Sequence, residues 1–296
     1  MPHLCSSANY ANTMEGEAVV FQQKNPAFAS FTKVYVPYCS SDEHSGDRQA
    51  SPETGNFHFN GRNIVTAVVD ELHARGMIGQ SGNKVVLAGA SAGGAGAAKN
   101  CDFVADKING LGYNAKVSCL LDGLDLEPTW LTSDCNLVER RTFWNAQQDS
   151  TCLQALGNEV ANCSSFSLFW SYIETPFMVV SSEADQVTHF CNRSPSLVDN
   201  SVGSFGRRWR EGMAKLGQEM VDTGRADIGV FLGNCPFHIA MENSAVFSEM
   251  PVTVVGQQGN KVTLSQAILN WMAGQGPYHA IDNPAETNPM CSKVTE

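Results

Sequence analysis

The 296-residue sequence predicts an α/β fold in which a mostly parallel sheet is flanked by helices and carries a disulfide-bearing cap insertion. Short apolar runs alternate with stretches of helical spacing, ten cysteines are spread along the chain, and one aperiodic segment interrupts the alternation. Strands separated by helices pair in parallel, and such a sheet needs helices on both faces. The length fits one large domain, so we expect a single domain over residues 1–296.

Hydrophobic periodicity places the individual elements. One stretch has helical spacing and ends at Gly76, and its apolar face would hold Ile64, Val68 and Leu72. A later apolar run, residues 84–89, is too short for a helix and is expected to form a buried strand. The predicted strands are residues 34–37, 84–89, 116–121, 176–182 and 228–232, and the predicted helices are residues 59–76, 92–109 and 205–222.

Residues of about 130–170 break this alternation and have little clean periodicity. They contain three tryptophans and three cysteines, which are Trp130, Trp144, Trp170, Cys135, Cys152 and Cys163. We expect an insertion that caps the sheet and bears disulfides. Its aromatic side chains are expected to form the core of the cap, with a substrate groove lined by some of them as the alternative.

The charge balance excludes one class of partner. The chain has 30 acidic and 19 basic residues, which give a net charge of −11. Its densest basic cluster, residues 207–210, is too small for the basic surface that nucleic acid requires, so no nucleic acid partner is expected. No stretch approaches the roughly 18 consecutive apolar residues of a membrane span. The sequence does not indicate an oligomeric state.

The cysteines indicate the compartment. They include no C-x-x-C pair, which disfavours zinc ribbons and thioredoxin-like redox motifs. An even number fits disulfides formed in an oxidising compartment, so we expect a secreted extracellular protein. The alternative is a cytosolic enzyme with buried thiols. Residues 1–20 lack the basic start and apolar run of a signal peptide, so we expect a mature or truncated N-terminus.

The motif Gly89-Ala90-Ser91-Ala92-Gly93 fits the pattern G-x-S-x-G. In this pattern a serine occupies a sharp turn between a strand and a helix. The context agrees, because a predicted strand precedes the motif and an Ala/Gly-rich helix follows. The start of that helix would favour a developing oxyanion. The motif therefore predicts a nucleophilic Ser91 in an α/β-hydrolase-like fold. A phosphate loop is excluded because no Lys-Ser/Thr follows the glycines.

A nucleophilic serine needs a histidine that takes its proton, and in this fold the histidine follows both the serine and the acid. Three of the seven histidines follow Ser91. His238 comes just after the predicted strand 228–232, where a late loop would carry the base. His189 lies too near the candidate acid, and His279 lies in a polar tail. We expect His238 to be the general base, with a satisfied loop histidine as the alternative.

Two carboxylates compete for the acid that orients His238. The predicted strand 176–182 runs into Glu183 and Asp185, which are two positions apart. Both cannot point at one histidine. The strand-end pattern of α/β-hydrolases favours Asp185, so we predict Asp185 as the acid and keep Glu183 as the alternative.

Several segments together resemble the pectin acetylesterase and Notum family of carboxylesterases. The strand with Cys119 and Asp122 is similar to one of the family's strands, and Cys235-Pro236-Phe237-His238 is similar to its C-x-x-H loop. The matching segments are residues 34–46, 89–94, 116–123, 234–238 and 265–271. Together they cover most of residues 25–275. The joint match is specific, whereas each segment alone is not.

The resemblance assigns roles to individual residues. It implies that Ser91 is the nucleophile, that His238 is the base and that the backbone N–H of Ala92 is one oxyanion donor. The family's Gly-Gly-Trp oxyanion loop should lie upstream of Cys5. We therefore expect either a truncated N-terminus or an oxyanion hole that is completed by another donor.

The resemblance also bears on the acid. The family's acid lies in an Asp-x-x-Gln arrangement, which aligns with residues 183–186 and would make Glu183 the acid. The sequence therefore leaves the choice between Glu183 and Asp185 open.

The function that the resemblance implies is a serine carboxylesterase that hydrolyses short acyl esters, acetyl above all, on pectin or another polysaccharide. Its expected partner is an acylated carbohydrate or another small ester, and no cofactor is expected. The alternatives are a Notum-like esterase acting on an acylated protein and a catalytically weak or inactive binding protein. A metal site is not expected, because HExxH-type spacing is lacking and Cys235-x-x-His238 is a weak ligand pair.

Overall fold

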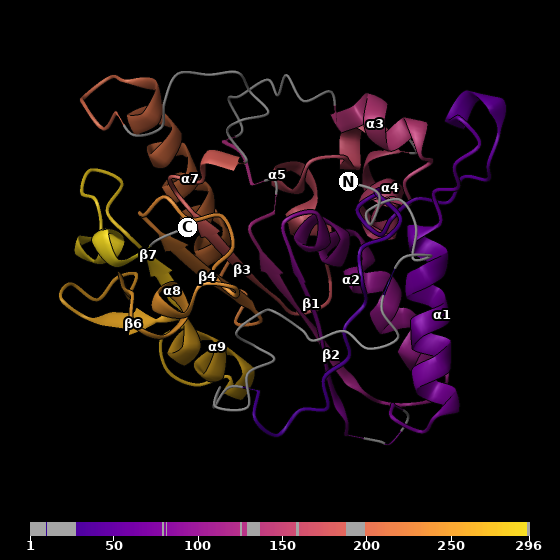
Figure 1. The fold of residues 1–296 in the computed structure, drawn as a ribbon. Coiled ribbons are helices and arrows are strands. Elements are labelled where there is room, and N and C mark those ends of the chain that lie inside the picture. Colours follow the sequence, from indigo (N-terminus) through magenta and orange to yellow (C-terminus); the bar gives the residue numbers. More distant parts are fainter. Residues whose placement is uncertain are drawn as a thin grey trace. The chain divides into compact units, whose positions relative to one another are not determined.

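The computed structural model describes Tyr10 and residues 28–78, 80, 82–124, 126–128, 137–157, 160–187 and 199–294. The chain divides into two compact units. Most of the first unit is Val34–Leu120 and Asn136–Pro176, and most of the second is Phe177–Glu296 with Leu121–Cys135. Figure 1 shows the helices and strands of both units and labels most of them.

Helices and strands alternate in the first unit as predicted. The chain forms α1 (Gly61–Ala74), β1 (Lys84–Ala90), α2 (Ala92–Gly110) and β2 (Lys116–Asp122), whose last two residues belong to the second unit. The elements expected at residues 59–76, 84–89, 92–109 and 116–121 are therefore confirmed. The burial expected of residues 84–89 is not, because every residue of β1 is exposed or only partly buried. The buried apolar side chains that join them are Val69, Ile78, Val104, Ala105, Ile108, Ala115 and Val117.

The face of α1 that enters this core includes Leu72 as predicted, but Val65 and Val69 take the places expected for Ile64 and Val68. Val69 is buried, and Val65 and Leu72 pack against the core. Ile64 and Val68 are only partly buried. Where apolar residues occupy adjacent positions of a helix, two neighbouring faces have the same apolar spacing. The sequence alone does not say which face is buried, and packing against the core decides it.

The strand predicted at residues 34–37 is wrong. These residues have no regular secondary structure, and the side chains of Val34 and Tyr35 are 44% and 49% exposed. Pro37 has no backbone N–H to donate to a strand ladder. The apolar side chains of residues 34–37 are therefore buried too little to stabilise a strand.

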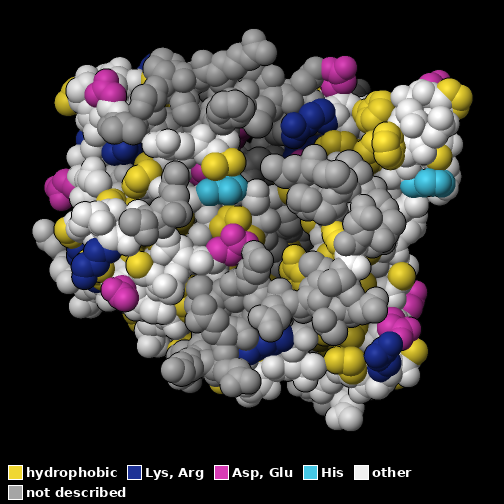
Figure 2. Space-filling view, in the orientation of Figure 1, with side chains coloured by type: hydrophobic (Ala, Val, Ile, Leu, Met, Phe, Trp, Pro, Cys, Tyr) yellow, Lys and Arg dark blue, Asp and Glu magenta, His cyan; other side chains and the backbone are white. Residues whose placement is uncertain are grey.

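The segment expected to be an insertion is helical. It contains α3 (Leu137–Phe143), α4 (Ser150–Leu156) and α5 (Phe166–Phe169), and a disulfide joins Cys152 of α4 to Cys163, which precedes α5. Phe166 and Phe169 are buried and meet edge to face at 5.6 Å, as expected for a small core. Figure 2 shows hydrophobic side chains gathered beside α3. Trp130 and Cys135 lie outside the described residues, and the role of the segment as a cap stays a prediction.

The second unit contains a parallel sheet. Its strands β3 (Phe177–Ser182), β4 (Ile228–Gly233) and β7 (His279–Ile281) lie in this order, and β4 pairs in parallel with both neighbours. The other elements are α7 (Phe205–Asp222), α8 (Ser244–Ser248), the antiparallel pair β5 (Pro251–Thr253) and β6 (Lys261–Thr263), and α9 (Leu264–Ala273). The strands predicted at 176–182 and 228–232 and the helix predicted at 205–222 are confirmed.

Two helices of this unit cover opposite faces of β4. A Cβ at Gly217 of α7 would meet the side chains of Val230 and Leu232. A Cβ at Gly229 would instead meet Trp271 of α9. Neighbouring residues of a strand point to opposite faces, so α7 and α9 lie on different sides of the strand. The α/β class, with a mostly parallel sheet flanked by helices, is therefore confirmed.

The C-terminal region holds more structure than predicted. His279 does not lie in a polar tail but begins β7, and its Nε2 lies 2.7 Å from the carbonyl oxygen of Ile228. The strands β5, β6 and β7 have three residues each. Such short strands are fixed by their neighbours and leave no periodicity in the sequence.

Disulfides occur in both units. They join Cys101 to Cys119, Cys152 to Cys163 and Cys235 to Cys291, whereas Cys39 is a thiol. Cys5, Cys135 and Cys191 lie outside the described residues. Of the helices that the structure describes, none is long and apolar enough to cross a membrane.

Candidate active site

Ser91 occupies a sharp turn between β1 and α2 in the first unit. Its backbone has φ 55° and ψ −123°, a conformation that residues with a side chain rarely adopt. Such strain is of the order of 1–3 kcal/mol and persists where the surrounding structure imposes it, often at functional sites. The predicted strand–turn–helix context of the G-x-S-x-G motif is present.

The two glycines of the motif differ in the space available for a side chain. A Cβ at Gly89 would clash with the carbonyl oxygen of Gly93, because the strand before the turn lies against the first turn of α2. A Cβ at Gly93 would meet nothing within 4 Å. Close packing across the turn therefore requires glycine only at the first of these positions.

The backbone N–H of Ala92 belongs to the first turn of α2. The first four N–H groups of an α-helix have no partner within the helix, and the helix dipole places partial positive charge there. Both features suit the oxyanion donor that the sequence predicts at Ala92. That role stays a prediction.

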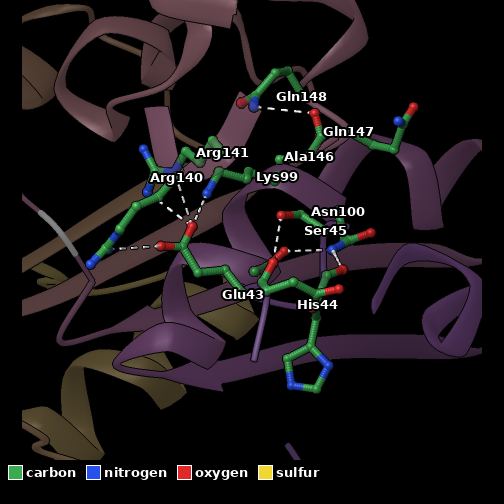
Figure 3. A network of polar contacts seen from close by, with 12 residues as sticks. Glu43, His44, Ser45, Lys99, Asn100, Arg140, Arg141, Ala146, Gln147 and Gln148 are labelled. Carbon is green, nitrogen blue, oxygen red and sulfur yellow. Dashed lines mark hydrogen bonds and ion pairs between the residues drawn. The ribbon is translucent and has the colours of Figure 1, made fainter. Parts of the chain in front are cut away.

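The loop that contains Glu43 is anchored on α2. Figure 3 shows the carboxylate of Glu43 facing Lys99 of α2 and Arg140 and Arg141 of α3. The Nη2 of Arg141 lies 3.0 Å from Glu43, and the side chains of Lys99 and Arg141 are each 1% exposed. A Cβ at Gly96 would clash with the carbonyl oxygen of Glu43. This ionic cluster fixes the loop to the helix that begins after Ser91.

His238 and Asp185 lie together in the second unit. The Nδ1 of His238 is 2.8 Å from Oδ2 of Asp185, whose side chain is only 2% exposed. The other oxygen of Asp185 accepts the backbone N–H of Val187 at 2.8 Å. When Nδ1 carries the proton, it donates a hydrogen bond to Asp185. The Nε2 atom is then left as an acceptor, as a general base requires.

The loop that carries His238 is anchored at its start. The backbone N–H of Asn234 donates to Asp282 at 3.1 Å, and Cys235 is bound to Cys291. The hydroxyl of Ser182 donates to the carbonyl oxygen of Cys235. These contacts join the loop to the end of β3, from which the chain continues to Asp185.

Glu183 lies elsewhere in the second unit. Its side chain is fully buried, and its carboxylate oxygens have no hydrogen-bond partner among the described residues. Burial and the charge of Asp282 raise the pKa of Glu183 well above its usual range, although Arg210 opposes the shift. The structure thus brings Asp185 to His238 and leaves Glu183 apart from it.

The environment of His238 raises its pKa. Burial alone lowers the pKa of an imidazole, but the hydrogen bond that His238 donates to Asp185 and the charges of Asp185, Asp122 and Glu242 outweigh burial here. His189 lies outside the described residues. Within the described part of the chain, no cluster of three or more His, Cys, Asp or Glu side chains could hold a metal ion.

These features define an α/β protein that carries, in its two units, the kinds of residue that serine hydrolases use. The chain matches the family model Pectinacetylesterase over residues 2–292 and belongs to this family. The resemblance found in the sequence motifs is therefore confirmed.

Named relatives fall into two groups. Palmitoleoyl-protein carboxylesterase notum2 of Xenopus laevis is 27% identical over an alignment of 328 residues, gaps included, which covers 98% of this chain and 63% of that protein. Palmitoleoyl-protein carboxylesterase NOTUM of Homo sapiens is 42% identical over 118 residues, 39% of this chain and 23% of that protein. Pectin acetylesterase 5 of Arabidopsis thaliana is 24% identical over an alignment of 293 residues, gaps included, which covers 90% of this chain and 65% of that protein. This chain thus spans less than two thirds of each of these relatives.

Proposed function

We propose that the protein is a secreted serine carboxylesterase that removes short acyl groups, acetyl above all, from a polysaccharide such as pectin. Ser91 is the nucleophile, His238 the general base and Asp185 the acid that orients it. The backbone N–H of Ala92 is one donor to the oxyanion.

The reaction takes place in two halves. The Oγ of Ser91 attacks the ester carbonyl carbon while Nε2 of His238 takes the hydroxyl proton. The tetrahedral oxyanion is stabilised by the Ala92 N–H and collapses, and the sugar oxygen leaves with the proton from His238. Water, activated by the same histidine, then hydrolyses the acyl-enzyme to the carboxylic acid and restores Ser91.

The observation that carries this proposal is the backbone of Ser91. A serine held at positive φ between a strand and the start of a helix is the geometry of a nucleophile elbow. Membership of the pectinacetylesterase family and the 2.8 Å contact between His238 and Asp185 support it.

A series of p-nitrophenyl esters with increasing acyl length tests the proposal. We expect the highest kcat/KM with acetate, and we expect Ser91→Ala to abolish turnover while the protein stays folded. Ser248→Ala changes an exposed serine of α8 and is the matched control. Unchanged turnover in Ser91→Ala would rule out the serine mechanism.

The second candidate is an esterase for a longer acyl chain on a protein. The match to palmitoleoyl-protein carboxylesterase notum2 over 98% of this chain favours it. The same ester series separates the two candidates, because a site for a long chain gains kcat/KM with each added methylene until the pocket is full. A catalytically inactive binding protein would hydrolyse none of the esters.

Secretion is supported by the three disulfides, which form and persist in oxidising compartments. Peptide mapping of protein from an oxidising host, without reduction, should recover the three linked peptides. Recovery of these six cysteines as thiols would contradict the secreted assignment.

A further inference from the structure

A buried carboxylate at the end of β2 holds the chain just after His238. Asp122 is fully buried. Its Oδ2 accepts the backbone N–H of Met241 at 2.7 Å, and its Oδ1 accepts that of Ala240 at 3.2 Å. Burial raises the pKa of Asp122 to about 7, against the effect of these two hydrogen bonds, so the carboxylate is ionised above that pH. Hydrogen bonds to an ionised group are stronger than neutral ones, and leaving buried donors unsatisfied is costly. Asp122 therefore fixes the two positions that lie two and three residues beyond the histidine.

Gly123, the residue after Asp122, packs directly against the backbone of His238. Gly123 has φ 55°, and its N–H donates to the carbonyl oxygen of Val180 at 3.0 Å. A Cβ at Gly123 would clash with the carbonyl oxygen of His238 and would lie 3.5 Å from its Nδ1. The backbone of His238 thus rests directly on the turn that follows Asp122, and both conformation and space require glycine there.

The loop of His238 is consequently held on two sides. Ser182 and the Cys235–Cys291 disulfide anchor the residues before the histidine. Asp122 and Gly123 anchor the histidine and the residues after it. The hydrogen bond from Nδ1 to Asp185 depends on the direction of the imidazole ring, which these backbone contacts fix.

We infer that Asp122 is a positioning residue of the esterase, which acts through the backbone of Ala240 and Met241 to keep the ring of His238 aligned with Asp185. This inference rests on the proposed function, in which His238 is the general base. Asp122 does not touch the reacting atoms. Its effect is expected in kcat rather than in KM, because the substrate is bound by other groups.

The experiment compares Asp122→Asn with a matched control, Asp102→Asn. Asp102 is also buried and also accepts two consecutive backbone N–H groups, those of Glu174 at 3.0 Å and Thr175 at 2.8 Å, but it does so in the first unit. Both variants replace a carboxylate oxygen that accepts a backbone N–H by an amide group. Both should therefore lower the melting temperature to a similar extent.

Only Asp122→Asn should change the histidine. We expect kcat on p-nitrophenyl acetate to fall by up to about 100-fold with KM unchanged, as for a misplaced catalytic group. The NMR titration of His238 should move to lower pH, because the charges of Asp185, Asp122 and Glu242 raise the pKa of His238 and the variant removes that of Asp122. The low-field Nδ1 proton of His238 should weaken.

Other results would overturn the inference. If Asp122→Asn loses stability like Asp102→Asn but keeps its kcat and the low-field Nδ1 proton of His238, Asp122 is only structural. If Asp122→Asn does not fold, Asp122→Ser, which keeps one acceptor, replaces it. If neither variant folds while Asp102→Asn does, the inference also fails. Failure of the proposed function is seen separately, as full turnover by Ser91→Ala, while the NMR comparison still tests the positioning of His238.

Discussion

At the scale of single residues, the account depends on the pair His238 and Asp185. The imidazole can act as a general base only when it is neutral, and the nearby carboxylates raise its pKa above the ordinary 6.5. Activity should therefore be full above this raised pKa and should be lost as the pH falls through it.

Asp185→Asn should lower kcat by roughly 10⁴-fold, as loss of a triad acid does, and should move the acidic limb of the pH–rate profile to lower pH. Both effects follow because the hydrogen bond and the charge that raise the pKa of His238 are removed. Glu183→Gln is the control, since Glu183 lies apart from His238. An equal loss in both variants, or a larger one in Glu183→Gln, would mean that Asp185 is not the acid. The profiles of kcat/KM from pH 5 to 9 provide the measurement.

At the scale of elements, the turn between β1 and α2 has glycine at both ends of the G-x-S-x-G motif, but only Gly89 is required by packing. Gly89→Ala should destabilise the protein by about 1–3 kcal/mol or more, because its Cβ meets the carbonyl oxygen of Gly93. Gly93→Ala should be neutral or should stabilise by up to about 1 kcal/mol, since the new methyl group has room and alanine favours a helix. Urea denaturation measures both, and similar losses would contradict the assigned packing.

The loop that contains Glu43 allows a buried ion pair to be compared with an exposed one. Glu43→Gln should cost about 3–5 kcal/mol, because Lys99 and Arg141 remain buried without their shared carboxylate. Glu53→Gln removes an exposed ion pair with Arg48 and should cost about 1 kcal/mol or less. Equal costs would show that the buried cluster does not stabilise the fold.

The buried cluster of Glu43, Lys99 and Arg141 also predicts that the stability of the protein depends on pH. Burial raises the pKa of Glu43, but the charges of Lys99 and Arg141 outweigh burial and lower it to about 2. A lowered pKa in the folded state stabilises the protein above the unfolded-state value of 4.5, and this stabilisation is lost as the pH falls toward 2. The stability difference between the wild type and Glu43→Gln should therefore shrink over this range.

The sequence predicts the long elements well and the short ones poorly. The helices and strands with several buried residues, such as β4 and α7, carry a period that identifies them. The three residues of β7 carry none, and their strand pairing is set by β4. The apolar residues 34–37 show the converse, because a strand pattern without burial does not form a strand.

The same limit applies to the candidate site. Ser91, Ala92 and His238 are found from motifs, since a local turn or loop gives each a recognisable context. The approach of Asp185 to His238 and the orphaned carboxyl group of Glu183 follow from tertiary packing, which two carboxylates two positions apart do not specify. Asp122 is visible in the sequence as part of a strand that resembles one of the family's strands, but its contact with the loop of His238 is not.

At the scale of the whole molecule, the disulfides should contribute unequally to stability. In the chain-entropy relation, a loop of 56 residues closed by Cys235–Cys291 stabilises by about 1.4 kcal/mol more than a loop of 11 closed by Cys152–Cys163. Replacing each pair by two alanines should reveal this difference in the free energy of unfolding. The two double variants are matched because they remove the same atoms. A smaller loss for the longer loop would show that strain or unfolded-state structure dominates.

The most direct test of the central claim is covalent labelling of the nucleophile. An alkyl fluorophosphonate reacts with a serine only where a base activates it, and peptide mapping by mass spectrometry identifies the labelled residue. The account predicts one adduct, on Ser91, formed several orders of magnitude more slowly in His238→Ala and absent from Ser91→Ala. Labelling of another serine, or equal labelling rates in the wild type and His238→Ala, would contradict it.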